Sequence, residues 1–105
     1  MASLNNEIFS RNELFWGKEF QNFLQTKHIA VFGLGGVGGH CAEALARSGV
    51  GELTIVDFDT VSTSNINRQI IALNSTVGKY KVDVMADRMK DINEEITLNS
   101  NKFIF

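Results

Sequence analysis

The glycine-rich segment 33–38 (GLGGVG) constrains the fold more than any other part of the sequence. It follows the short apolar run 28–32 and precedes a stretch of good helix formers. Between a strand and a helix, a GxGxxG pattern permits a tight turn at Gly33 and lets the backbone approach phosphate oxygens at Gly35. Gly38 allows the helix to pack closely on the strand, and the amino end of the helix offers free N–H groups. This context predicts a nucleotide site rather than a purely structural turn.

The rest of the sequence alternates helical and strand patterns. A strand, a helix and a second strand within about 30 residues make a βαβ unit, which requires a parallel sheet. A polar loop follows the second strand, at the strand end where α/β domains bind ligands. The expected elements are a helix over 12–24 with a possible break at Gly17, a buried strand over 28–32, a helix over 38–48, a strand over 53–56, a polar loop over 59–76, a helix with the apolar stripe Val82, Met85, Met89 and Ile92, and a strand over 96–105.

These elements predict an α/β fold, the first half (βαβαβ) of a Rossmann-like doubly wound parallel sheet, preceded by an amino-terminal helix. We assign residues 1–27 to an amino-terminal helical segment and residues 28–105 to the amino-terminal half of a nucleotide-binding domain. A doubly wound sheet normally continues through a second half. We therefore expect this chain to be a fragment of a longer protein.

Composition bounds the class of protein. The 105 residues are 44% hydrophobic and 21% charged, which is typical of one soluble domain, and eight phenylalanines indicate a substantial core. No apolar stretch has the length of a membrane helix or resembles a signal peptide, so we expect a cytoplasmic protein without a membrane partner. The single Cys41 excludes an internal disulfide and a two-CxxC zinc site, and we expect it to be buried and unreactive. A net charge of −2 gives no general attraction to nucleic acid.

Cationic side chains distinguish the nucleotide classes that such a turn can bind. Asp57, at the end of the second predicted strand, can accept hydrogen bonds from a ribose, which by itself suits NAD as well as ATP. A triphosphate under attack carries more negative charge than a pyrophosphate bridge and needs cations near its oxygens. Arg68 in the polar loop and Lys81 at the start of the next helix supply that charge. We favour ATP, with a NAD-binding oxidoreductase domain as the alternative.

The order of four motifs is specific to a family. The sequence runs from the glycine motif through a strand that ends in DFD (57–59) to SNINRQ (64–69) and then VGKYK (77–81). In this order the motifs resemble the MoeB/ThiF/HesA superfamily of carboxylate-adenylating enzymes, to which the ubiquitin-activating enzymes also belong. The resemblance covers about residues 8 to 95. Within the superfamily the chain looks most similar to the tRNA threonylcarbamoyladenosine dehydratase branch.

This resemblance implies roles for individual residues. Arg68 and Lys81 would be catalytic as well as ATP-binding. Arg11 would reach, as an arginine finger, into the active site of the other subunit of a homodimer. No metal ligand is assigned, because the magnesium-binding aspartate of the family would lie beyond Phe105. The implied nucleotide-binding residues are Gly33, Gly35, Gly36, Gly38, Asp57, Asp59, Ser64, Asn65, Arg68 and Lys81.

The reaction that the resemblance implies is attack of a substrate carboxylate on the α-phosphate of ATP, assisted by Mg²⁺, to give an acyl adenylate and pyrophosphate. In the dehydratase branch the carboxylate belongs to the threonyl group of a modified tRNA adenosine, which then closes into a ring with net loss of water. A ubiquitin-like sulfur-carrier protein is the alternative substrate. A further alternative is a fragment that folds or dimerises but binds and catalyses nothing; we expect this chain alone to be inactive as an enzyme.

Overall fold

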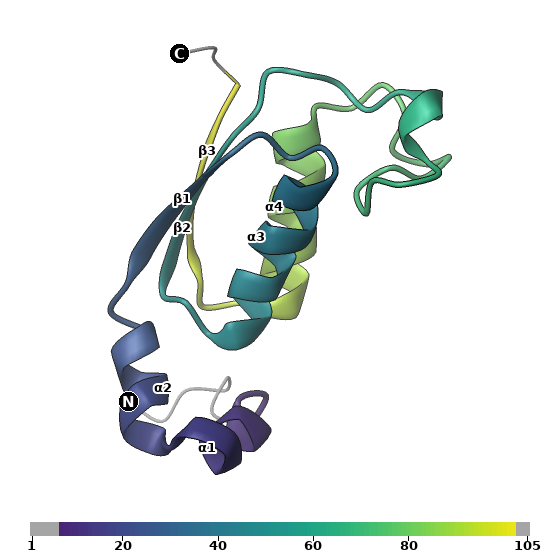
Figure 1. Ribbon diagram of the computed structural model, residues 1–105. Coiled ribbons are helices and arrows are strands. Elements are labelled where there is room, and N and C mark those ends of the chain that lie inside the picture. Colours follow the sequence, from purple (N-terminus) through teal and green to yellow (C-terminus); the bar gives the residue numbers. More distant parts are fainter. Residues whose placement is uncertain (1–6, 103–105) are drawn as a thin grey trace.

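Three parallel strands form a sheet in the order β1-β2-β3, seen edge-on in the computed structural model, which describes residues 7–102 (Figure 1). The three strands begin at the same level of the sheet: His28 pairs with Glu52, and Glu52 pairs with Thr97. The fold is thus the α/β arrangement predicted from the sequence. The elements are α1 Ser10–Trp16, α2 Lys18–Leu24, β1 His28–Phe32, α3 Val37–Ser48, β2 Glu52–Val56, the 3₁₀ turn η2 Thr63–Asn65, α4 Lys81–Ile92 and β3 Thr97–Asn101.

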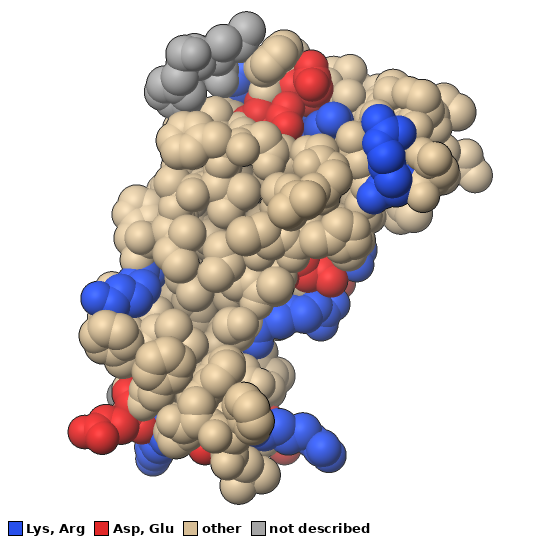
Figure 2. Space-filling model, in the orientation of Figure 1, with Lys and Arg blue, Asp and Glu red and all other residues tan. Residues whose placement is uncertain are grey.

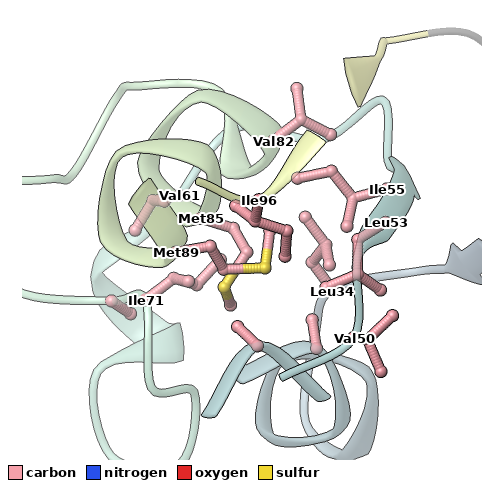
Figure 3. Close-up of a cluster of buried hydrophobic side chains, with 13 residues drawn as sticks. Leu34, Val50, Leu53, Ile55, Val61, Ile71, Val82, Met85, Met89 and Ile96 are labelled. Atoms are coloured by element: carbon pink, nitrogen blue, oxygen red, sulfur yellow. The ribbon is translucent and has the colours of Figure 1, made fainter. Parts of the chain in front are cut away.

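Helices α3 and α4 lie side by side and cover one face of the sheet (Figure 1). Their apolar stripes meet the inward side chains of β2 in one aliphatic core, drawn in Figure 3. Met85 and Met89 of the predicted stripe are fully buried, as is Val82, whereas Ile92 is half-buried at the edge. The core members are Leu34, Ala42, Ala46, Val50, Leu53, Ile55, Val61, Ile71, Ala72, Val82, Met85, Met89 and Ile96.

The first strand differs from its prediction. We expected residues 28–32 to be buried on both faces, but β1 alternates between exposed and half-buried residues, and Phe32 is 66% exposed. The physical reason is its position: β1 is an edge strand, and in residues 7–102 helices cover only one face of the sheet. His28 and Asn99 instead form a polar network on the open face through Thr54, with hydrogen bonds of 2.6 and 3.2 Å to its hydroxyl.

Phenylalanine contributes less to the core than the sequence suggested. Of the six phenylalanines among residues 7–102, only Phe9 is buried. Phe15, Phe20 and Phe23 lie on α1 and α2 and are exposed, with Trp16 in edge-on contact with two of them. The core consists mainly of aliphatic and methionine side chains.

A buried glutamine attaches the amino-terminal helices to the sheet domain. Gln21 accepts a hydrogen bond from the indole N–H of Trp16 (2.8 Å) and donates one to the carbonyl of Ser48 at the end of α3 (2.8 Å). Its amide lies against Gly49, which takes a left-handed conformation (φ 96°) and leaves no space for a Cβ atom. Gly17, with φ 91°, separates α1 from α2, which confirms the break that the sequence allowed.

Among residues 7–102, no helix has both the length and the apolar character needed to cross a bilayer.

A carboxylate joins the two helices that cover the sheet. Glu43 of α3 accepts hydrogen bonds from Arg88 of α4 and from Arg47 one turn along its own helix (3.3 Å). The hydrogen bond from Arg88 is the main cause that lowers the pKa of Glu43, against an opposing effect of burial, and Arg47 lowers it further. The ionised form of Glu43 therefore stabilises the packing of α3 on α4.

We predict that Glu43→Gln lowers the free energy of unfolding by about 1 kcal/mol at pH 7. A folded-state pKa below the unfolded value gives stability that is present above an unfolded pKa of about 4.3 and is lost as pH falls through the folded pKa. Urea unfolding at pH 7 and at about pH 3 measures this, and the two proteins should converge in acid. Glu94→Gln, at an exposed position without a described ion pair, is the matched control and should change little. An equal difference at both pH values would contradict the prediction.

Candidate nucleotide-binding site

The glycine turn connects the carboxyl end of β1 to the amino end of α3, at the top of the sheet in Figure 1. Gly33 (φ 89°) and Gly36 (φ 52°) take positive φ angles that side chains rarely allow. Gly33 donates a hydrogen bond to the carbonyl of Val56 (2.7 Å), which fixes the start of the turn to β2. A Cβ atom on Gly38 would overlap the carbonyl oxygen of Gly33, so close packing of the helix on the strand requires glycine there, as predicted.

Asp57 joins the glycine turn to the end of β2. One carboxylate oxygen accepts a hydrogen bond from the backbone N–H of Leu34 (2.7 Å), and the other accepts one from the N–H of Asp59 (2.8 Å). Asp57 is only 8% exposed. Its first role is therefore structural: it holds the turn after β1 and the loop after β2 in one arrangement. Each oxygen retains a lone pair that can accept a further hydrogen bond from a ligand hydroxyl.

The polar loop predicted over 59–76 leaves the sheet and returns to it. Backbone hydrogen bonds close it at its base: Val61 donates to Lys79 (2.8 Å), Gly78 donates to Val61 (2.8 Å), and Thr60 pairs with Tyr80 in an antiparallel bridge. Lys81 then donates its N–H to the carbonyl of Asp59 (3.0 Å) and begins α4. The loop closure thus brings Lys81, far from the glycines in sequence, to the same end of the sheet.

Lys81 and Gln69 lie over Gly35. A Cβ atom on Gly35 would be 3.6 Å from the Lys81 ammonium nitrogen and 3.0 Å from Nε2 of Gln69. Lys81 is 6% exposed and forms no ion pair with any carboxylate of residues 7–102. An ammonium without an ion-pair partner, held beside the glycine turn by a largely buried residue, is suited to an anionic group that approaches Gly35. The SNINRQ motif contained the only sequence signal for Gln69, which we had not assigned to the site.

Other residues of the SNINRQ motif shape the loop. The Asn65 side chain is buried and accepts a hydrogen bond from the N–H of Ser62 (2.9 Å), completing a capping box around η2. Ser64 is exposed, and its hydroxyl lies 3.2 Å from that of Ser62. The Arg68 guanidinium donates to the carbonyl of Ser64 (2.9 Å) and to the side chain of Asn67 (3.2 Å). The hydrogen bonds of Arg68 are therefore made within residues 64–68. Of the two predicted cations, it is Lys81 whose ammonium lies beside Gly35.

The remaining predicted residues are exposed. Asp59 lies at the base of the loop, with its backbone engaged to Asp57 and Lys81. Arg11 is on α1, at the opposite end of the sheet from the glycine turn (Figure 1), so within one chain it is remote from the site. Cys41 is also exposed on α3, which corrects the expectation of a buried thiol: it lies on the helix side that faces away from the core. No group of three or more His, Cys, Asp or Glu within residues 7–102 could hold a metal ion.

These features define a class of protein. A glycine turn after the first parallel strand, braced by an aspartate at the end of the next strand and faced by a buried lysine, is the nucleotide-binding half of a Rossmann-like α/β domain. The chain belongs to the ThiF family, whose family model matches residues 9–103.

Similar proteins agree with this assignment. The tRNA threonylcarbamoyladenosine dehydratase of Bacillus subtilis (strain 168) is 53% identical over 97 residues, which cover 92% of this chain and 38% of the relative. The molybdopterin-synthase adenylyltransferase of Salmonella typhimurium (strain LT2) is 42% identical over 98 residues, 93% of this chain and 38% of the relative. The crystal structure of Escherichia coli tRNA N6-threonylcarbamoyladenosine dehydratase in complex with ATP superposes with a TM-score of 0.95 at 38% identity, covering 99% of this chain and 43% of that one. The chain spans less than half of the length of each.

We predict that Gly35→Ala separates folding from nucleotide binding. Gly35 has no positive φ, and an added methyl would displace only the flexible ends of Gln69 and Lys81, so stability should stay within about 0.5 kcal/mol of the wild type. The methyl would occupy the space over the turn that a phosphate needs, and affinity for ATP should fall at least about tenfold. Thermal unfolding and calorimetric titration measure the two effects.

Gly38→Ala is the contrasting variant, because its methyl would meet the Gly33 carbonyl and should destabilise the fold itself. Equal ATP affinity of the Gly35→Ala protein and the wild type would show that phosphates do not approach the turn at this residue.

Proposed function

We propose that this chain is the ATP-binding part of an adenylating enzyme that activates a carboxylate, with the threonylcarbamoyl group of a modified tRNA adenosine as its substrate. The observation that carries the proposal is the Lys81 ammonium, which lies beside Gly35 at the end of a largely buried residue and lacks a described carboxylate partner. A lysine at this position neutralises the charge that develops on phosphate oxygens when a carboxylate attacks the α-phosphate. The similarity to the dehydratase of Bacillus subtilis over 92% of the chain supports the choice of substrate.

In this proposal the glycine turn binds phosphate through its backbone N–H groups and the amino end of α3. Asp57 accepts hydrogen bonds from the ribose through the lone pairs that its backbone contacts leave free. Asn65, with Ser64, orders the loop that carries Arg68, and Arg68 turns from its own loop toward the triphosphate when the nucleotide binds. Asp59 is a second polar anchor at the base of the loop.

Arg11 contributes from the second subunit of a homodimer, because α1 is remote from the glycine turn of its own chain. Residues 7–102 contain no cluster of His, Cys, Asp or Glu suited to a metal ion, so the Mg²⁺ that the family resemblance implies would need protein ligands outside this range. Enzymatic turnover requires the full-length protein, since the chain spans only 38% of the length of the relatives that suggest the reaction.

One face of the molecule offers no continuous basic surface for a tRNA (Figure 2). On the face shown in Figure 2, lysine and arginine form separate groups among acidic and uncharged residues, without the continuous basic surface that tRNA binding uses. A tRNA substrate would place the full-length enzyme in the cytoplasm, as the sequence predicts. The second candidate function is adenylation of the carboxyl terminus of a ubiquitin-like sulfur-carrier protein, and the 42% identity to a molybdopterin-synthase adenylyltransferase favours it.

We predict that the protein binds ATP in preference to NAD. The ammonium of Lys81 beside Gly35 should favour the more highly charged triphosphate over the dinucleotide. Calorimetric titration with each nucleotide tests this, and ATP at 100 times its dissociation constant should stabilise the fold by about 2.7 kcal/mol. If the protein binds NAD more tightly than ATP, a NAD-binding oxidoreductase domain becomes the better interpretation. No heat and no thermal shift with millimolar ATP would leave a fragment that folds without binding.

We predict that Lys81→Met in the full-length enzyme lowers the rate of ATP–pyrophosphate exchange at least about 100-fold, because a preorganised charge at the phosphates is lost. Arg68→Ala should lower the same rate at least about tenfold. Lys79→Met is the matched control: this lysine is two residues away, exposed, and has no described side-chain contact with the turn. Unchanged exchange with Lys81→Met would remove the lysine from the mechanism, as would an equal loss with Lys79→Met.

A further inference from the structure

Gln69 has a buried amide group that the proposed mechanism does not use. Its side chain is 8% exposed, and its Nε2 points toward Gly35, 3.0 Å from the position of a Cβ atom there. Its Oε1 is buried without a hydrogen-bond partner, and it is the one such side-chain atom among residues 7–102. Folded proteins rarely leave a buried carbonyl oxygen unpaired, because the loss of water is then uncompensated.

The backbone holds Gln69 in this position. Its N–H donates to the carbonyl of Asn65 (2.9 Å), and its own carbonyl accepts from the N–H of Ala72 (3.0 Å). The residues that follow are fixed as well: Ile71 and Ala72 belong to the hydrophobic core. The side chain therefore extends toward the glycine turn from a fixed backbone position.

Two unpaired groups of opposite character meet above the same glycine. The Lys81 ammonium has three N–H groups and no described carboxylate partner, and the Gln69 amide has one free acceptor and two donors. A phosphate oxygen over Gly35 would accept hydrogen bonds from both side chains, and the ammonium would still have an N–H to donate to Oε1 of Gln69. A phosphate would thus pair with donors of both residues, while Lys81 is the donor available to Oε1 of Gln69.

We propose that Gln69 is a phosphate-binding residue: its Nε2 donates to the phosphate oxygen that Lys81 contacts, and its Oε1 holds the lysine ammonium in place. The proposal rests on the proposed binding of ATP and adds a neutral donor to it. Neutrality is the important property. A carboxylate at the same position would pair with Lys81 and repel the phosphate, although it has nearly the same shape as the amide.

The test is calorimetric titration with ATP together with thermal unfolding without nucleotide, on the wild type and on Gln69→Glu and Gln69→Leu. Gln69→Glu should leave the unfolding temperature equal or higher, because Lys81 gains a partner, and should weaken ATP binding at least about tenfold. Gln69→Leu removes the unpaired Oε1 and keeps the volume, so it should fold as well as the wild type and bind ATP about three- to tenfold more weakly.

Gln25→Glu is the matched control: it makes the same change of charge at an exposed residue after α2, outside the glycine turn, and should leave ATP affinity unchanged within about twofold. Equal ATP affinity of the wild type and Gln69→Glu would overturn the role of Gln69 while leaving the proposed function intact. Unfolding of both Gln69 variants would also overturn it, since it would make the side chain a structural element. A wild type that binds no ATP would instead reject the proposed function.

Discussion

The hydrogen bond from the Leu34 N–H to the Asp57 carboxylate is the interaction on which the arrangement of the site depends. It is buried, 2.7 Å long, and links the glycine turn after β1 to the residue that ends β2. Because the other carboxylate oxygen binds the N–H of Asp59, one side chain sets the positions of two loops. Charge-assisted hydrogen bonds of this kind are strong and directional, so the loops keep a defined separation before a ligand arrives.

The polar loop over 59–76 starts from the position that Asp57 fixes. Its ends are joined by the Thr60–Tyr80 bridge, and its far part is stabilised by the capping box of Ser62 and Asn65. Because Ile71 packs into the hydrophobic core, the loop is anchored between its ends as well as at its ends. A polar segment of this length keeps one conformation only because backbone groups and one apolar anchor restrain it.

The Lys81 ammonium at the site forms no ion pair with a carboxylate of residues 7–102. Because Lys81 is largely buried, its ammonium is held beside the glycine turn, where it can attract an anion. The unpaired oxygen of Gln69 is a local cost of burial. The phosphate proposed to bind at Gly35 would pair with the Lys81 ammonium, which could in turn donate to the Gln69 oxygen; the aliphatic core lies away from the site. The core residues stabilise the fold, whereas Lys81 and Gln69 lie at the proposed binding site.

The sequence by itself determined the strands, the helices, the need for glycine at Gly38 and the membership of the family, because these depend on the chemistry and spacing of neighbouring residues. It also singled out Lys81, whose ammonium lies beside Gly35 in the structure. Only the tertiary structure decided that Asp57 braces the turn, that Gln69 faces Gly35, and that the hydrogen bonds of Arg68 stay within its own loop. The exposure of β1 and of most phenylalanines was likewise a tertiary result. The reason is physical: periodicity records which side of an element is apolar, whereas contact between distant residues depends on how the loop closes and which faces are covered.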